Sequence, residues 1–491
     1  MVQTYFFYDY ESWGTEPARD WPAQFAGIRT NADFEEIEQP LELFCRLPEY
    51  QLPHPEACLV TGLTPDEVNA KGIPEAGFIG QINEQFSRPN TCVLGYNSIR
   101  FDDEMTRYSL YRNFFDPYAR EWQNGCSRWD LIDVVRLCAA LRPEGINWPM
   151  REDGTHSFQL EELTKANGIV QEHAHNAVDD VRATIALARL LREKKPRLFQ
   201  YALDNRSKHK AAGFLDLISP RPKPVLHISG KFAAARNCLA VVVPLAAHPT
   251  NKNEVIVYDL SENPESLLTL EAEEIRERIY TTTVELEKRG CSRIPLKTIR
   301  LNRSPILAPV TLVEDPAEQE RLGISLDQCR KHYRVIFSGD HKQLAALRQK
   351  LMAVYSQNNM SVDDDPDHQL YDGFFSREDQ HQREVVRKTR PEQLAELSLP
   401  FQDKRLEEML FRYRARNWPE LLSHEDQEAW RAFCRNRIQN GCGGRSLPLA
   451  DYRIHLRGLM DSEINHDRKN VLISLEHSMN RCLQALNLLD E

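Results

Sequence analysis

Five side chains in the first 180 residues have the types and the spacing needed for metal-assisted hydrolysis. They are the carboxylates Asp9, Glu11, Asp102 and Asp180 and the histidine His175. Carboxylate oxygens are hard ligands, which favour Mg²⁺ or Mn²⁺ over zinc. Two such ions, about 3.5–4 Å apart, would activate a water molecule and stabilise a leaving oxygen. A histidine beside that water could act as the general base, because its pKa lies near neutral pH. We therefore predict that all five residues are catalytic and that the four carboxylates bind two metal ions.

Asp9 and Glu11 are expected at the end of the first strand. The aromatic run of residues 5–8 is typical of a buried strand. Side chains two residues apart on a strand project from the same face. Two carboxylates side by side raise each other's pKa unless a cation lies between them. The pattern therefore indicates a metal site, although a solvated strand end would have the same sequence.

Asp102 is expected at the start of a helix. A strand over residues 91–96 is followed by a turn, and Asp102 comes where the helix begins. An acidic residue at that position also interacts favourably with the helix dipole, and Asp103 or Glu104 would serve that purpose equally well. This motif alone leaves both interpretations open.

Residues 174–180 have the pattern of a helix start with two unusual residues. Asn176 is a good N-cap, and Asp179 stands three residues later, as in a capping box. His175 and Asp180 then occupy the two positions that meet in a hydrophobic staple, so their side chains are expected to point the same way. A histidine and a carboxylate at these positions would stabilise the helix start less than the two apolar side chains of a hydrophobic staple. This favours a functional role, with a surface ion pair as the alternative.

The hydrophobic pattern predicts an α/β domain over residues 1–195, a small β-rich domain over 196–354 and a helical domain over 355–491. In the first domain, strands are expected over 5–8, 23–30, 41–47 and 91–96, with helices over 131–141, capped by Asp130, and over a segment that ends before Pro196. In the second domain, strands are expected over 224–229, 239–243 and 254–260, with a helix over 271–280. Residues 356–367 are polar and acidic and are expected to be a linker.

The composition is that of a globular protein without a basic surface. The chain has 491 residues, which predicts about three domains, and 41% of them are hydrophobic against 27% charged. The net charge of −11 excludes a general attraction to nucleic acid, so a nucleic-acid site must be a local basic channel. The sequence has no apolar run of membrane-span length, no signal peptide and eleven scattered cysteines, which predict reduced thiols. We therefore expect a cytoplasmic protein that does not bind membranes.

The spaced carboxylates and histidine, together with Asn97 and Phe101, are similar to the motifs of the DEDD exonucleases in their histidine variant. Longer segments resemble the bacterial exodeoxyribonuclease I family; they cover residues 6–11, 94–107, 127–131, 141–149, 163–169, 369–375 and 412–417. The resemblance therefore extends over nearly the whole chain.

This resemblance implies an RNase H-like exonuclease domain, an SH3-like β-barrel domain and a helical C-terminal domain. It implies an enzyme that hydrolyses single-stranded DNA from the 3′ end, releases 5′-mononucleotides and acts in DNA repair or recombination. The expected cofactor is Mg²⁺, bound as two ions, with Mn²⁺ able to substitute. The expected partner, besides DNA, is the C-terminal tail of single-stranded DNA-binding protein, which Arg142 would bind. A monomer in the bacterial cytoplasm is expected.

Several residues are predicted to contact the DNA strand. Tyr118 and Trp122 would share one face if their segment were helical, and could stack on bases; core packing is the alternative. Arg107 and Arg136 would bind phosphates. Lys208 lies in a basic cluster that could follow the DNA backbone; the alternative is that this cluster is a solvated linker. The predicted substrate-binding set is Glu11, Arg107, Tyr118, Trp122, Arg136, Gln159 and Lys208. Gln159 departs from the resemblance, because the family commonly has an arginine at this position. The contact with a substrate phosphate that the arginine implies would therefore be weaker here, or another residue would make it.

Two other functions remain compatible with the sequence. One is a 3′→5′ exoribonuclease of the same superfamily. The other is a scaffold that binds single strands without cutting them, although the presence of all five catalytic residue types argues against it. Arg412, Arg414 and Arg416 are expected to pair with acidic residues and not to enter the site.

Overall fold

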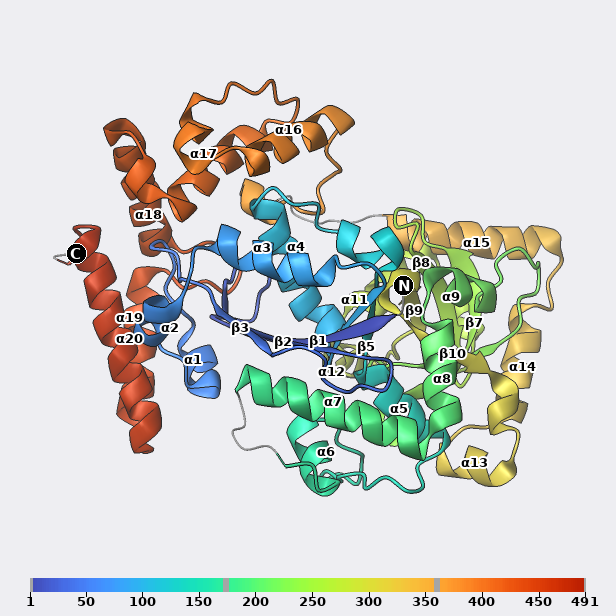
Figure 1. The fold of residues 1–491 in the computed structure, drawn as a ribbon. Coiled ribbons are helices and arrows are strands. Elements are labelled where there is room, and N and C mark those ends of the chain that lie inside the picture. Colours follow the sequence, from blue (N-terminus) through green and yellow to red (C-terminus); the bar gives the residue numbers. More distant parts are fainter. Residues whose placement is uncertain (1–2, 171–175, 357–362, 490–491) are drawn as a thin grey trace. The chain divides into compact units, whose positions relative to one another are not determined.

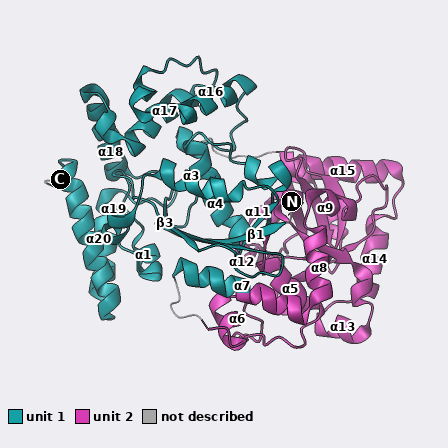
Figure 2. Cartoon of the chain, viewed as in Figure 1, with its two compact units in different colours: residues 1–128, 171–185, 361–491 teal, residues 129–170, 186–360 magenta. Residues whose placement is uncertain are grey.

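The computed structural model of the protein describes residues 3–170, 176–356 and 363–489 (Figure 1). The chain forms two compact units, and each brings together segments that are distant in the sequence (Figure 2). The first unit comprises residues 1–128, 171–185 and 361–491, and the second comprises 129–170 and 186–360. The predicted domain limits at 195 and 354 stay predictions.

A five-stranded mixed sheet positions the first half of the predicted site. Its strand order is β3-β2-β1-β4-β5. The strands are β1 (Thr4–Ser12), β2 (Pro22–Thr30), β3 (Leu41–Phe44), β4 (Thr91–Gly95) and β5 (Ser127–Asp130). β1 lies in the middle of the sheet, antiparallel to β2 and parallel to β4. A central strand is paired on both sides, so its side chains are held in a fixed register.

The two faces of β1 have different roles. Phe6, Tyr8 and Tyr10 belong to a hydrophobic core that also includes residues of α3 (Glu75–Phe86). Because successive side chains of a strand alternate between faces, Asp9 and Glu11 project from the face opposite that core. The sheet thereby fixes both carboxylates on one face, away from that core.

Helices of the first unit contribute to this core, although some of them come more than 300 residues after the sheet in the sequence. Trp430, Leu472 and Leu483 pack in the same hydrophobic cluster as Phe25 of the sheet. The remaining helices of this unit are α1 (Pro55–Thr61), α2 (Pro65–Lys71), α4 (Asp102–Arg112), α16 (Arg377–Lys388), α17 (Arg405–Asn417), α18 (His424–Asn440), α19 (Leu449–Ser462) and α20 (His466–Ala485). α7 (Ala177–Lys194) begins in the first unit.

The second unit contains a five-stranded antiparallel sheet with the order β10-β6-β7-β8-β9. Its strands are β6 (Val225–Ile228), β7 (Leu239–Ala247), β8 (Glu254–Asp259), β9 (Leu296–Arg300) and β10 (Ile306–Pro309). Its helices are α5 (Ile132–Leu141), α6 (Leu160–Ala166), α8 (Pro196–Asn205), α9 (Lys208–Phe214), α10 (Glu265–Thr269), α11 (Ala272–Tyr280), α12 (Thr283–Lys288), α13 (Pro316–Arg321), α14 (Leu326–Ile336) and α15 (His341–Ser356).

The acidic segment predicted to be a linker is anchored at its end. Arg412 lies 2.6 Å from Asp365 and 3.1 Å from Asp367, and Arg416 lies 2.7 Å from Asp367. The prediction that these arginines pair with acidic residues is confirmed. The interpretation of residues 356–367 as a linker stays a prediction, and ion pairs hold the aspartates at its described end.

The predicted fold class is confirmed. The strands expected at the start of the chain are all present, and β1 extends further than the aromatic run predicted. The sequence prediction missed β9, β10, α14 and α15 of the second unit. Among the described residues, no helix combines the length and the apolar character that crossing a bilayer requires.

Candidate active site

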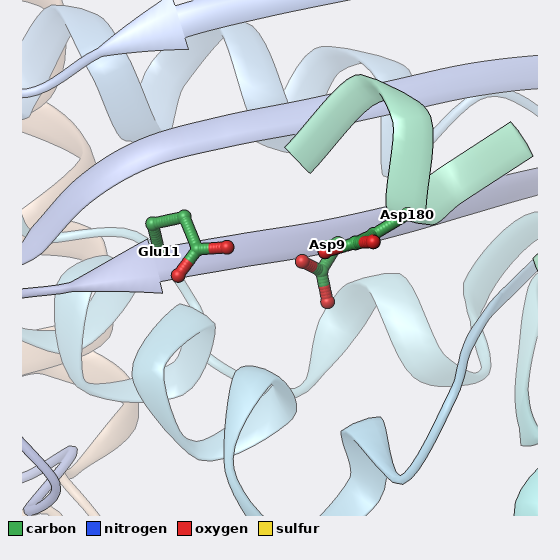
Figure 3. Close-up of side chains that lie close together, drawn as sticks. All are labelled: Asp9, Glu11 and Asp180. Atoms are coloured by element: carbon green, nitrogen blue, oxygen red, sulfur yellow. The ribbon is translucent and has the colours of Figure 1, made fainter. Parts of the chain in front are cut away.

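Three of the predicted carboxylates come together in one group. Figure 3 shows Asp9 and Glu11 on β1 and Asp180 reaching them from α7. Each residue offers a carboxylate oxygen, and these three oxygens lie within 4.8 Å of one another. All three residues are partly buried. Residues separated by more than 160 positions in the sequence therefore form one oxygen-rich cluster.

The start of α7 places Asp180. The Asn176 Oδ1 accepts hydrogen bonds from the backbone amides of Val178, at 3.1 Å, and Asp179, at 3.4 Å. The predicted N-cap is therefore confirmed, and it satisfies amides that have no partner within the helix. Asp180 follows in the first turn, where the positive end of the helix dipole favours a carboxylate.

Burial and mutual repulsion shift the pKa values in this cluster. Burial raises the pKa of Asp9 to about 8, and the neighbouring charge of Asp180 adds to that increase. Burial likewise raises the pKa of Glu11 to about 9, with further contributions from the charges of Asp9 and Asp180. A bound divalent cation would lower these pKa values, because its positive charge stabilises the ionised carboxylates.

The ligand set fits a hard divalent cation. It consists of carboxylate oxygens alone, without a sulfur ligand, which is the set that Mg²⁺ and Mn²⁺ prefer. The raised pKa values of Asp9 and Glu11 reflect burial together with the charge of the neighbouring carboxylates. The cluster is therefore a candidate metal centre.

Asp102 lies at the first position of α4 and is buried, but it is not part of the three-residue group. The turn that leads to it depends on Gly95, since a Cβ there would lie 2.8 Å from the Tyr8 carbonyl oxygen. Asn97, in the same turn, has a left-handed backbone with φ of 60°. A metal-binding role for Asp102 stays a prediction.

Asp103, next to Asp102, has a structural role that the sequence left open. Its carboxylate accepts hydrogen bonds from Arg120 at 2.6 Å, from Arg128 at 2.8 Å and from the Tyr8 hydroxyl at 3.0 Å. Two arginines hold the pKa of Asp103 below its usual range, although burial alone would raise it. This network ties α4 to β1 and thus helps to position the strand that carries Asp9.

His175 lies outside the described residues. Its place beside Asp180, and its role as the general base, stay predictions from the sequence. The confirmed N-cap at Asn176 supports the register on which that prediction rests.

Tyr118 and Arg107 form a connected pair. The Arg107 guanidinium lies 5.2 Å from the centre of the Tyr118 ring. It also donates to both carboxylate oxygens of Glu121, at 2.8 and 2.9 Å, and to Glu104 at 3.1 Å. Only 5% of the Arg107 side chain is exposed. In this structure Arg107 supports the Tyr118 ring, and a direct phosphate contact stays a prediction.

Trp122 is 66% exposed, so it is not a core residue. The expectation that it shares a helix face with Tyr118 is wrong, because the segment is not a continuous helix. Short 3₁₀ turns at Ala119–Glu121 and Gln123–Gly125 flank Trp122, whose backbone φ is −150°. Exposure of the indole is nevertheless compatible with base stacking.

The remaining predicted DNA contacts lie in the second unit. Arg136 pairs with Asp133 at 2.7 Å, and its guanidinium lies 5.8 Å from the Phe158 ring centre. Gln159 is exposed just before α6. Lys208 begins α9 and donates to the Asn253 side chain. Their contacts with DNA stay predictions.

Arg142 follows α5 and is exposed, with a hydrogen bond from its guanidinium to the Leu141 carbonyl oxygen. This contact caps the end of its own helix. The bond uses one guanidinium nitrogen, and the predicted peptide contact of Arg142 stays a prediction.

Comparisons with known proteins agree with this fold and site. Models of three domain families match the chain: an exonuclease over residues 6–188, the Exonuclease I SH3-like domain over 206–357 and the Exonuclease I C-terminal domain over 364–481. The chain is 46% identical to exodeoxyribonuclease I of Haemophilus influenzae, over 89% of this chain and 91% of that protein. It is 45% identical to exodeoxyribonuclease I of Escherichia coli, over 87% of this chain and 88% of that protein.

Solved structures show the same architecture. Escherichia coli Exonuclease I in complex with a dA16 oligonucleotide has a TM-score of 0.92 at 41% identity. The zinc-bound form of the same enzyme with single-stranded DNA has a TM-score of 0.91 at 41% identity. A structure of SSB/Exonuclease I with an inhibitor has a TM-score of 0.88 at 40% identity. Each match covers 98% of this chain and 100% of the other.

Fold, site and comparisons together define an exonuclease with an SH3-like domain and a helical C-terminal domain. The chain belongs to the exodeoxyribonuclease I family. Enzymes of this kind depend on a divalent metal, which agrees with the carboxylate group described above.

Proposed function

We propose that this protein hydrolyses single-stranded DNA from the 3′ end and releases 5′-mononucleotides. The observation that carries the proposal is the cluster of Asp9, Glu11 and Asp180, in a chain whose relatives are exodeoxyribonucleases. The complexes of Escherichia coli Exonuclease I with single-stranded DNA support this substrate.

Two Mg²⁺ ions are the proposed cofactor, with Mn²⁺ able to replace them. Asp9 and Glu11 would hold the ions from β1 and Asp180 from α7, and Asp102 would complete the second position. When bound, the ions would lower the pKa of a water molecule and stabilise negative charge on the leaving 3′ oxygen. The all-oxygen ligand set supports Mg²⁺, whereas the zinc of one related structure supports only a divalent cation.

His175 is the proposed general base. It would accept the proton of the attacking water, at a pH where a neutral imidazole is available. Asn176 holds the start of α7 in place next to it, so Asp180 and His175 would act from one rigid helix end.

The DNA strand would be bound by stacking and by charge. Tyr118, supported by Arg107, and the exposed Trp122 would stack on unpaired bases. Arg136, Lys208 and Gln159 would contact the sugar–phosphate backbone, and Glu11 the terminal nucleotide. Since the protein carries a net charge of −11, duplex DNA would gain little from non-specific attraction.

A protein partner is proposed as well. Arg142 would bind the terminal carboxylate of the tail of single-stranded DNA-binding protein, and the structure of SSB with a related Exonuclease I supports such a complex. The proposal includes a role in DNA repair or recombination in the bacterial cytoplasm, since the relatives are bacterial DNA exonucleases. A monomer is proposed as the active form.

End-labelled substrates test the direction and the substrate together. A 3′-labelled single strand should lose its label at once as mononucleotide, while a 5′-labelled strand of the same sequence should shorten progressively. Both reactions should need Mg²⁺ and stop in EDTA. Early loss of the 5′ label would contradict the direction, and faster digestion of the matching RNA oligomer would favour the exoribonuclease alternative.

A further inference from the structure

Two histidines and a glutamate of the first unit converge outside the carboxylate group of the active site. His54 directly precedes α1, Glu56 lies in the first turn of α1, and His455 lies on α19. The His54 Nδ1 is 2.8 Å from the Glu56 Oε2, and the His455 Nε2 is 2.5 Å from the Glu56 Oε1. One carboxylate therefore contacts two imidazoles that are about 400 positions apart in the sequence.

Ion pairs alone leave one atom of this group unexplained. A protonated imidazole beside a carboxylate would account for each of the two contacts. The Glu56 Oε2, however, is shielded from solvent and accepts no hydrogen bond of good geometry, although the His54 ring lies next to it. Buried polar atoms usually have a partner. A cation shared with the histidine nitrogens would supply one.

The spacing of the two rings suits a common metal ion. The ring centres of His54 and His455 lie 6.2 Å apart, with the planes at 64°. With Zn–N bonds of about 2.0–2.1 Å, two imidazoles on one ion have their ring centres about 5–6 Å apart. The ligand atoms of the three residues do not all lie within 4.8 Å of one another, unlike those of the active-site carboxylates. An ion would therefore draw the two rings slightly closer together.

The backbone around the three side chains is fixed, so this movement needs side-chain rotation alone. Cys58 of α1 and Tyr452 and Leu456 of α19 are buried in the same hydrophobic cluster. The backbone amide of His54 donates a 2.7 Å hydrogen bond to the Trp13 carbonyl oxygen. The two histidine side chains are 32% and 38% exposed, which leaves them room to turn and gives an ion and water access.

This ligand set differs from that of the active site in the metal it prefers. Two imidazole nitrogens and one carboxylate are typical ligands of Zn²⁺, whereas Mg²⁺ prefers oxygen ligands alone. Three protein ligands leave the fourth position of a tetrahedral ion to a water molecule. The protein would therefore have one oxygen-rich site for Mg²⁺ and one nitrogen-containing site for Zn²⁺.

We propose that His54, Glu56 and His455 bind one Zn²⁺ ion, with a water molecule as the fourth ligand. The ion joins α1, in the region that matches the exonuclease model, to α19, in the region that matches the Exonuclease I C-terminal domain. Because the ligands come together only in the folded chain, binding of Zn²⁺ stabilises the folded state. This proposal does not depend on the proposed function.

The test compares metal binding by the full chain, without a histidine tag, in wild type, His54→Ala, Glu56→Gln and His455→Ala. Titration calorimetry gives the Zn²⁺ affinity. Co²⁺ is the spectroscopic probe, because four-coordinate Co²⁺ with nitrogen ligands absorbs visible light much more strongly than six-coordinate Co²⁺ with oxygen ligands. Thermal unfolding in EDTA and in Zn²⁺ separates the effect of the metal from that of the ion pairs.

Two further variants serve as controls. His466→Ala removes a histidine of the same unit whose side chain is 88% exposed and lies 4.0 Å from the carboxylate of Asp467. It therefore tests whether any exposed histidine beside an acid gives the same signal. Asp9→Asn alters the active-site carboxylates and identifies metal bound there.

We expect each of the three ligand variants to bind Zn²⁺ at least about 10-fold more weakly than wild type, since loss of a group that merely supports a ligand already costs 10- to 100-fold. The intense Co²⁺ absorption should be absent from these variants and present in His466→Ala and Asp9→Asn. Zn²⁺ should raise the unfolding temperature of wild type and His466→Ala more than that of the ligand variants.

Wild-type protein without the intense Co²⁺ absorption would overturn the proposal and leave plain ion pairs between Glu56 and protonated histidines. This result needs no variant, so it decides the question even if a substitution prevents folding. Unchanged Zn²⁺ affinity in His455→Ala, or an equal loss in His466→Ala, would also overturn it. Loss of the absorption in Asp9→Asn would assign the signal to the active site. Nuclease activity is not among the readouts, so failure of the proposed function would leave all of these results unaffected.

Discussion

The carboxylate of Asp180, in the first turn of α7, lies beside that of Asp9 on β1 and raises its pKa. The two residues come from elements at opposite ends of the exonuclease region of the sequence. Burial and the neighbouring carboxylates raise the pKa of both Asp9 and Glu11. The fold therefore holds like charges together, and this arrangement has consequences that can be measured.

The first prediction concerns pH and the stability of the metal-free protein. Asp9 and Glu11 have pKa values of about 8 and 9 in the folded protein, against about 4 in the unfolded chain. Between about pH 5 and 8 the folded state therefore binds more protons, so its free energy of unfolding should fall as the pH rises. Calorimetry in EDTA at several pH values should show that the free energy of unfolding falls less steeply with pH in Asp9→Asn than in wild type.

Saturating Mg²⁺ should stabilise wild type more at pH 8 than at pH 6, because it binds the deprotonated carboxylates. Identical slopes in wild type and Asp9→Asn would contradict the raised pKa of Asp9.

The second prediction separates two adjacent aspartates. Asp103→Ala should destabilise the protein by about 3–5 kcal/mol, because it removes the nearer of the two carboxylates that pair with the fully buried Arg120. Asp102→Ala, the matched control one residue earlier, should leave stability nearly unchanged and abolish turnover. Chemical denaturation gives the first quantity and mononucleotide release gives the second. An Asp102→Ala protein with turnover within tenfold of wild type would remove Asp102 from the site.

The third prediction concerns the general base. His175→Ala should slow hydrolysis about 10²–10⁴-fold, the usual contribution of such a group, while Mg²⁺ affinity persists. Single-turnover rates and Mg²⁺ titration calorimetry would be measured on the same preparation. A loss of Mg²⁺ affinity would instead make His175 a ligand or a structural support.

The fourth prediction concerns the peptide partner. Arg142→Ala should bind an acidic peptide with a free C-terminal carboxylate about 10- to 100-fold more weakly, since a charged hydrogen bond contributes about 1.5–3 kcal/mol. A peptide with an amidated C-terminus is the control, and it should bind equally to both proteins. If affinity for the free peptide is unchanged, the helix-capping bond to Leu141 is the only role of Arg142 that the structure supports.

The sequence predicted the site better than its surroundings, and the reason is physical. Strand periodicity placed Asp9 and Glu11 on one face, and the capping pattern at Asn176 placed Asp180, because both rules act over a few residues. The network of Asp103, Arg120 and Arg128 depends on chain folding over longer distances, so no local pattern indicates it.

The aromatic residues show the same limit. Helical spacing suggested that Tyr118 and Trp122 share a face, but the turns around Trp122 break the helix. The contact of Tyr118 with Phe374 joins residues more than 250 positions apart, and only the structure brings them together. The resemblance to a family, not the spacing of residues, supplied the expected substrate and partner.

The most direct test of the account is the release of 5′-mononucleotides from single-stranded DNA over a Mg²⁺ titration, in wild type and in Asp180→Asn. This substitution keeps the shape of the side chain and removes the charge that a metal ion needs. Wild type should be active only with the metal, and Asp180→Asn should be slower by about 10³-fold or more at saturating Mg²⁺, because a metal ion contributes several kcal/mol to the transition state. Wild-type activity in EDTA, or an Asp180→Asn rate within tenfold of wild type, would contradict the claim that this carboxylate cluster is the metal-dependent catalytic centre.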